Sequence, residues 1–209
     1  MIKHLYPLVR DLHLCIGLFL APFVLVFSFS VFFLTHAWIP GQAQTSNPSR
    51  VVTGATLPAN IETLDGRARV DALRAVLPQL GVEGEIGFVR HIPKQRRLVF
   101  AASVPGRETT VSVDVAGRSA TITQRDSGIW DGLVKLHKSP GPHLAAIRMN
   151  WFPMRVWQWF ADGAVYLLLF TTLSGVYLWA VLRGERAAGL AMLIAGALSF
   201  IGIVYAITY

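Results

Sequence analysis

Four of the six histidines in this 209-residue chain stand where a redox cofactor in a membrane would need them. His13 and His36 lie at the two ends of one apolar stretch, while His137 and His143 precede a second. A neutral imidazole nitrogen is a good axial ligand for haem iron, and two imidazoles from facing segments make a low-spin electron carrier. These positions therefore allow haem ligation. The alternative is that they are interfacial histidines without a cofactor, because a histidine at a membrane interface can reach water at little cost.

The spacing of these histidines limits which pairs can share an iron. His13 and His36 are 23 residues apart, about 34 Å along a helix, so they cannot bind the same iron. His137 and His143 lie on either side of a Pro-Gly-Pro break at residues 140–142. We therefore expect His36 to meet one of these two histidines at the same membrane face.

Three stretches are apolar and long enough to cross a bilayer: residues 14–38, 156–182 and 187–207. About 22 such residues reach about 33 Å as a helix. The first and third contain no Asp, Glu, Lys or Arg, and the second carries only Asp162 near one end. A cleaved signal peptide ending near residues 41–43 is the alternative for the first stretch, but the stretch is longer than a usual signal-peptide core. We predict three transmembrane helices in contact with a lipid bilayer.

Basic residues at the ends of these stretches predict the orientation. Arg10 lies in the N-terminal segment 1–13, and Arg183 and Arg186 lie in the short loop 183–186. By the positive-inside rule, both flanks are expected on the cytoplasmic side. The long middle segment and the C-terminus are then expected outside.

The middle segment contains one stretch with the pattern of a small α+β domain, residues 57–126. A linker, 39–56, precedes it, and an amphipathic membrane-surface segment, 127–155, follows it. Apolar residues at helical spacing predict a helix over 70–81. Strand-like runs with short turn-like connectors predict a meander of hairpins at 85–92, 97–104, 109–116 and 119–125. His91, at the end of one such run, is interpreted as a surface histidine.

Composition excludes several classes of function. The chain is 53% hydrophobic and 15% charged, whereas soluble domains are nearer a quarter charged. Its net charge of +7 fits cytoplasmic anchoring at a membrane rather than nucleic-acid binding, since no basic helix or zinc spacing accompanies it. The single Cys15 rules out an internal disulfide and a multi-cysteine metal cluster, and it is expected to be a buried, inert thiol.

Five short motifs resemble those of a known family of membrane proteins. They are RDLHLCIG at 10–17, FLTHA at 33–37, LHKSPG at 136–141, WQWFAD at 157–162 and TLSGVYLW at 172–179. Together they resemble the PepSY-associated transmembrane helix family, in its short, three-helix form. The segment between the first two membrane helices resembles a PepSY-like domain. The resemblance thus implies a membrane α-helical fold with an inserted small α+β extracytoplasmic domain.

The resemblance implies a bacterial inner-membrane location and haem b, because larger members of that family include haem-bearing reductases of iron–siderophore complexes. It implies haem contacts at His13, His36 and His137, with Arg10 placed to pair with a haem propionate, a role that suits its guanidinium fork. An outer haem held by His36 and His137 is the preferred site, with His143 as the alternative ligand.

The chain departs from the larger members by having three spans, with no histidine near the cytoplasmic end of the second or the third. An inner haem at His13 would need Met192, a second copy of the chain or a partner subunit. Two hypotheses about function follow: a haem b electron-transfer protein within a larger complex, or a non-enzymatic accessory or assembly subunit whose soluble domain binds a partner. A protease regulator acting through the soluble domain is a third, weaker hypothesis. Other membrane subunits or further copies of the chain are the expected partners.

Overall fold

The computed structural model describes residues 2–39, 45–139, 145–182 and 186–208. The chain divides into two units. We call Met1–Pro22 together with Asp162–Tyr209 the helical unit, and Phe23–Ala161 the sheet unit. Each is described by itself below.

Three long helices confirm the prediction of three apolar spans. They are α1 (Ile2–Thr35), α4 (Phe152–Val181) and α5 (Arg186–Thr208), and each is long and apolar enough to cross a membrane. Helix α1 has 34 residues and begins well before residue 14, where the charge-free stretch begins. Its candidate membrane span is Leu5–Thr35, which starts earlier than predicted because apolar residues also precede Arg10 and Asp11.

The sheet unit contains one antiparallel sheet. Its main path runs β1-β7-β6-β5-β3, with β2 also paired to β7 and β4 also paired to β5. The strands are β1 (Thr45–Ser46), β2 (Arg50–Thr53), β3 (Glu85–Ile86), β4 (Arg90–Ile92), β5 (Arg97–Val104), β6 (Arg107–Asp114) and β7 (Ser119–Asp126). The predicted meander of β5, β6 and β7 is confirmed, and its register aligns Phe100, Val111 and Ile122 across the three strands.

Two parts of the sheet differ from the predictions. The segment 39–56 was expected to be a linker, but it contributes β1 and β2, both paired with β7. The β-branched pair in Arg-Val-Val-Thr suits a strand, and the free edge of β7 provides its hydrogen-bond partners. The strand expected over 85–92 is interrupted between β3 and β4, and both halves pair with β5.

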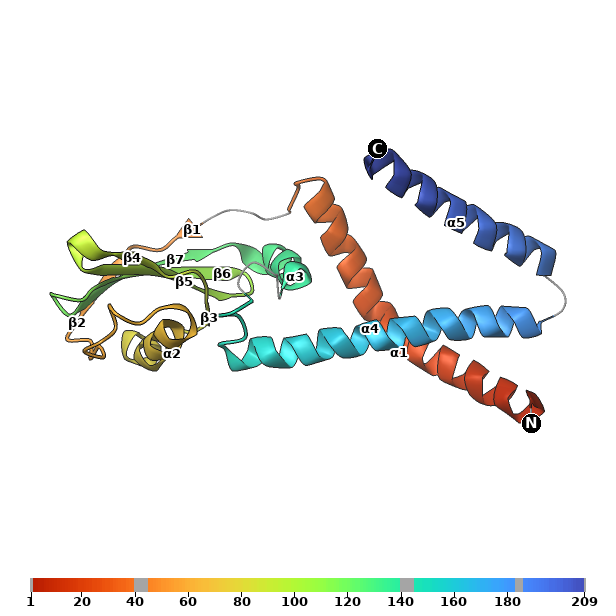
Figure 1. Cartoon of the computed structure of the whole chain (residues 1–209), viewed down its shortest axis with the longest axis horizontal. Coiled ribbons are helices and arrows are strands. Elements are labelled where there is room, and N and C mark those ends of the chain that lie inside the picture. The colour runs from red at the N-terminus through yellow and green to blue at the C-terminus, as the bar shows by residue number, and fades with distance from the viewer. Residues whose placement is uncertain (1, 40–44, 140–144, 183–185, 209) are drawn as a thin grey trace. The chain divides into compact units, whose positions relative to one another are not determined.

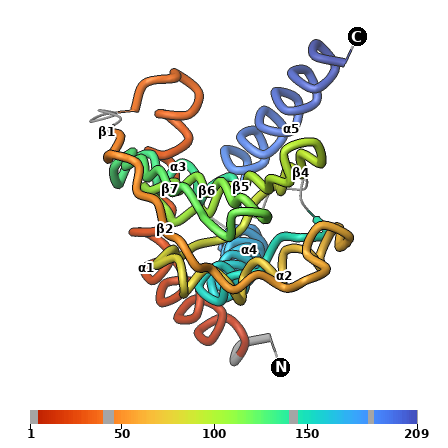
Figure 2. Tube along the Cα trace, turned by 90° about the vertical axis from the view of Figure 1, so that its left-hand side faces the viewer, coloured from red at the N-terminus to blue at the C-terminus, as the bar shows by residue number. Residues whose placement is uncertain are grey.

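The core of the sheet unit lies on one face of the sheet. Helix α2 (Gly66–Val76) and the 3-10 turn η1 (Leu77–Leu80) lie against this face, as both views show (Figure 1, Figure 2). Alternation along the strands directs apolar side chains toward α2, while exposed threonines and other polar residues occupy the opposite face. The fully buried side chains of the core include Ile61, Val70, Leu73, Leu98, Val111 and Val113.

The segment expected to lie on the membrane surface, 127–155, is partly integrated into this core. It begins with helix α3 (Gly128–Lys138), which the amphipathic pattern predicted, and ends in a strap at 145–151. In the strap, the buried Asn150 accepts a hydrogen bond from the Ile86 N–H (2.9 Å) and donates one to the Ile86 carbonyl (2.8 Å). The buried Ile147 belongs to the core. The sheet domain therefore extends beyond the predicted boundary at residue 126, because the Asn150 side chain takes the place of a strand at the β3 edge.

Candidate functional site

His13 is held between two helices of the helical unit. It lies on α1, half-buried, and its Nδ1 is 2.8 Å from the Ser174 Oγ of α4. Ser174 is only 5% exposed, and the next residue, Gly175, leaves room for the imidazole, since a Cβ built there would lie 3.4 Å from its Cε1. A small residue beside a polar one thus allows the close helix contact that positions the histidine.

The hydrogen bonds of Ser174 indicate which ring nitrogen of His13 carries the proton. The Ser174 hydroxyl donates to the Thr171 carbonyl at 3.1 Å, and a hydroxyl has one proton to donate. The assignment that satisfies both bonds has the His13 Nδ1–H donating to the Ser174 oxygen. The His13 Nε2 is then unprotonated and carries a free lone pair. A histidine whose one nitrogen is fixed by a hydrogen bond has the arrangement found in metal-ligating imidazoles.

Arg10, one turn before His13 on α1, contacts its sequence neighbour. Its Nε donates to the Asp11 Oδ1 at 3.0 Å, and both side chains are more than half exposed. An exposed ion pair of this kind contributes little and exchanges readily. The guanidinium therefore remains able to turn toward another anion.

His36 follows the last residue of α1 and is exposed. Its ring stacks on Phe32 with 4.2 Å between ring centroids, and its Nδ1 lies 2.9 Å from the Phe32 carbonyl oxygen. The carbonyl can only accept, so Nδ1 is the donor, and in the neutral ring Nε2 is the nitrogen with the lone pair. The ring stacking and the hydrogen bond both involve Phe32, one turn earlier in the chain. The local sequence at the end of α1 therefore determines the orientation of the His36 ring.

His137 lies near the end of α3, beside a group of rings that we call the aromatic cluster: Phe23, Phe27, Trp157 and Phe160. Phe27 is central, with its ring 5.6 Å from both His137 and Trp157. Phe160 lies 5.5 Å from Trp157 and 5.0 Å from Phe23. The His137 imidazole is itself exposed, so it has one apolar side and one open side.

The structure places His36 and His137 against different turns of α1. Their ring partners, Phe32 and Phe27, are five positions apart, about 7.5 Å along the axis and about 140° around the helix. Among the residues that the structure describes, no contact joins the two imidazoles. The outer site with these two ligands stays a prediction.

His91 in the sheet unit is less exposed than its interpretation as a surface histidine implied. Its Nε2 lies 3.8 Å from the Glu62 Oε1, and its side chain is 20% exposed. Arg96 also bonds Glu62, at 2.6 Å, and this hydrogen bond lowers the pKa of the Glu62 carboxyl. Arg96 balances the charge of Glu62, while the buried His91 Nε2 has no hydrogen-bond partner among the described residues.

Several other residues lie differently from the sequence interpretation or went unnoticed by it. Cys15, expected to be buried, is exposed on α1, since its side of the helix has no neighbouring protein segment among the described residues. Ser174 and Phe27 were not singled out as site residues. The row of small residues at Thr171 and Gly175 is the signal that identifies this stretch of α4 as a close helix contact.

Two sequence predictions fall outside the described residues. They concern His143, the alternative ligand, and residues 41–43, the candidate signal-peptide cleavage site. Met192, the candidate second ligand for an inner haem, is described and is 76% exposed on α5. Within the described ranges, no group of three or more His, Cys, Asp or Glu side chains is placed to hold a metal ion.

Compared with protein-family models, curated proteins and solved structures, the chain matches none of them. The resemblance to the PepSY-associated family therefore stays a prediction based on its motifs. Helix lengths, hydropathy and the sheet establish a chain with three candidate membrane spans and a separate antiparallel sheet domain.

Proposed function

We propose that this protein binds haem b and transfers electrons as one subunit of a larger membrane complex. The observation that carries the proposal is the hydrogen bond from His13 to the nearly buried Ser174, which leaves the His13 Nε2 free. A polar pair within an apolar helix contact is costly in lipid and is usually functional. Haem ligation accounts for both the free nitrogen and the fixed ring.

Haem supplies reversible one-electron chemistry, and the residues of this chain supply its ligands and surroundings. His13 offers one axial nitrogen on α1, and Arg10 lies three residues earlier, where its guanidinium can pair with a propionate after releasing Asp11. The second axial ligand would come from another copy of the chain or from a partner subunit. This requirement supports a complex rather than a solitary carrier.

His36 and His137 are the proposed ligands at the opposite end of α1. The hydrogen bond of His36 leaves its Nε2 free, and the aromatic cluster beside His137 offers an apolar surface of the kind a porphyrin ring packs against. An electron acceptor on the outer face of the membrane, such as ferric iron, would be reduced there.

The proposed location is the bacterial inner membrane, with the N-terminus in the cytoplasm and the sheet domain and C-terminus in the periplasm. The basic residues around the first helix and between the second and third support this orientation. Arg186, at the start of α5, donates to the Ala180 carbonyl at 2.9 Å, so its charge lies beside the end of α4. Cysteine-accessibility labelling of Ser49→Cys and Arg186→Cys in Cys15→Ser cells would test the proposed sides.

Absorbance spectra of the detergent-purified chain, supplied with haem and then reduced with dithionite, test the redox proposal. We expect a Soret band that shifts on reduction. His13→Ala should remove or weaken this band, while His91→Ala, in the sheet unit, should leave it unchanged. Comparing His36→Ala and His137→Ala then shows whether an outer haem exists. A chain that takes up no haem in any of these preparations would refute the proposal.

A second candidate, a non-enzymatic accessory or assembly subunit, is favoured by α5. This helix is apolar on all sides, and none of its described residues is buried. A helix that is hydrophobic all round is surrounded by lipid or by another protein. If the chain copurifies with a stable set of membrane proteins but binds no haem, this second function is the better one.

A further inference from the structure

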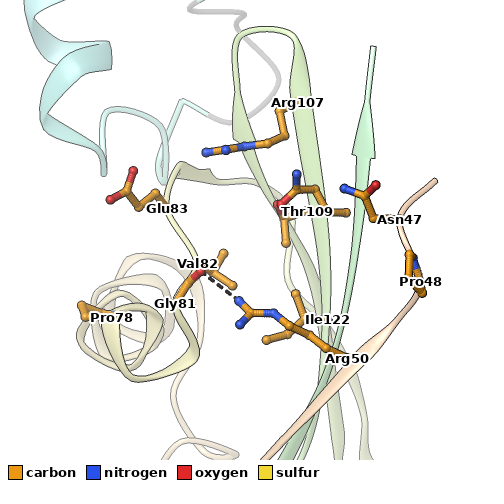
Figure 3. Close-up of a pocket in the computed structure, with 11 residues that line it drawn as sticks. Asn47, Pro48, Arg50, Pro78, Gly81, Val82, Glu83, Arg107, Thr109 and Ile122 are labelled. Atoms are coloured by element: carbon orange, nitrogen blue, oxygen red, sulfur yellow. Dashed lines mark hydrogen bonds between the residues drawn. The ribbon is translucent and has the colours of Figure 1, made fainter. Parts of the chain in front are cut away.

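The sheet unit contains a polar pocket of about 620 Å³ where the hydrophobic core ends. Along β6 and β7, the face that packs on α2 carries Val111 and Ile122. One step further along the strands this face carries Thr109 and Gln124, and two steps further along β6 it carries Arg107. The turn after η1 forms the opposite wall (Figure 3). The volume lies in the range of small-molecule sites, and the change from apolar to polar lining leaves a hollow rather than a packed core.

Two arginines line this pocket, and one is already fixed in place. The Arg50 Nη2 donates to the Leu80 carbonyl at 2.7 Å and to the Gly81 carbonyl at 2.9 Å. Gly81 has a φ of +59° and a Cβ there would lie 3.2 Å from that same nitrogen, so glycine is required both for the turn and for the close approach of the guanidinium. The charge of Arg50 is thus held at the pocket wall before any ligand arrives.

The second arginine of the pocket is Arg107. It extends from β6 into the pocket (Figure 3). Arg107 forms no ion pair or hydrogen bond with any side chain that the structure describes. Glu83 is the one acidic residue lining the pocket, and its carboxylate is not within ion-pair distance of either arginine.

We propose that this pocket binds a small anionic solute through a carboxylate or phosphate group, with Arg107 and Arg50 as its contacts. The guanidinium forks match the geometry of such an oxyanion, and the hydroxyl of Thr109 adds a neutral donor beside them. The carboxylate of Glu83 lies on the opposite wall of the pocket, where it repels any further negative group of the ligand. This proposal concerns the sheet unit alone and does not rest on haem binding.

Isothermal titration of the detergent-purified full chain with citrate, and separately with inorganic phosphate, tests the proposal at constant ionic strength. We expect one equivalent of at least one anion to bind, and comparing the two distinguishes a carboxylate ligand from a phosphate ligand. Arg107→Met keeps the apolar stem and should weaken binding about tenfold or more. Glu83→Gln removes a like charge and should tighten binding about twofold to threefold.

Arg97→Met is the matched control, because Arg97 is exposed at the start of β5, outside the pocket, and its replacement changes the net charge equally. It should alter affinity by less than about twofold. Far-UV circular dichroism of each variant verifies that the sheet is intact. The proposal is wrong if neither anion binds, if Arg107→Met binds as the original chain does, or if both arginine variants lose affinity equally.

Discussion

The two units of this protein are stabilised by different means. In the sheet unit, a continuous set of buried apolar side chains joins α2 to one face of the sheet. In the helical unit, the only described residues that are buried are Leu20 and Ser174. Burial of apolar surface drives folding in water, but lipid tails are as apolar as leucine and provide no such force between helices. The contrast indicates that single polar contacts, such as the one between His13 and Ser174, determine the geometry inside the membrane.

The largest expected effect tests whether the core of the sheet unit carries its stability. Leu73 is fully buried on α2, so Leu73→Ala should lower the free energy of unfolding of the sheet unit by about 2–5 kcal/mol. Hydrogen–deuterium exchange of β5 and β6 amides in the purified full chain measures this change. Leu193→Ala, on the exposed surface of α5, is the control and should alter those amides very little. Equal effects of the two variants would contradict the comparison.

A smaller effect is expected at the strap that joins the sheet to α4. Asn150→Ala removes three hydrogen bonds, two with the Ile86 backbone and one with the Ile147 carbonyl, and leaves buried backbone groups unpaired. We expect a cost of about 1–3 kcal/mol. The amide of Ile86 should exchange much faster, while Thr110→Ala on the exposed face of β6 should not affect it. Unchanged protection of the Ile86 amide would show that the strap does not depend on Asn150.

In the helical unit, we expect a local effect at His13 without unfolding. Ser174→Ala removes the acceptor of the His13 Nδ1–H, at a cost of about 0.5–1.5 kcal/mol. The ¹⁵N chemical shifts of the imidazole should then show a mixture of tautomers in place of one. Thr172→Ala is a matched control, because the Thr172 hydroxyl bonds only to the Leu168 carbonyl of its own helix. A tautomer population insensitive to Ser174→Ala would remove the geometric basis of the haem proposal.

The smallest expected effects concern pH and have opposite signs at two carboxyls of the sheet unit. Burial raises the pKa of Glu85, although the backbone N–H groups of Met149 and Asn150 oppose this shift. The folded state then binds a proton more readily than the unfolded state, so this group adds stability as pH falls and removes it as pH rises through the raised pKa. Glu85→Gln should therefore make stability less dependent on pH in this range.

Glu62 should behave in the opposite way. The hydrogen bond from Arg96 lowers the pKa of Glu62, so its contribution to stability is present above the ordinary carboxyl pKa and is lost as pH falls through the lowered value. Thermal unfolding midpoints of Glu85→Gln and Glu62→Gln between about pH 3 and 8 provide the measurement. If the two substitutions change the pH dependence of the unfolding midpoint in the same direction, burial is not the dominant influence on Glu85 or ion pairing is not the dominant influence on Glu62.

Local sequence patterns predict much of the fold, and the elements that they did not predict were missed for physical reasons. The three spans and the β5–β6–β7 meander were predicted because hydropathy and alternation are properties of short windows. The pairing of β2 with β7 was missed, since a short strand depends on a free edge contributed by distant residues. The break between β3 and β4 was missed for a related reason, because the buried Asn150 from far along the chain bonds that edge.

For the candidate site too, the sequence predicted one part and only the tertiary structure showed the other. The sequence alone determined that imidazoles stand near the ends of the first charge-free apolar stretch, since residue type and helical rise are sufficient for that conclusion. Only the tertiary structure decided that Ser174 fixes the ring of His13, and that His36 and His137 contact different turns of α1. Hydropathy records how each residue prefers lipid or water, whereas a hydrogen bond between residues 161 positions apart depends on which faces of two helices meet.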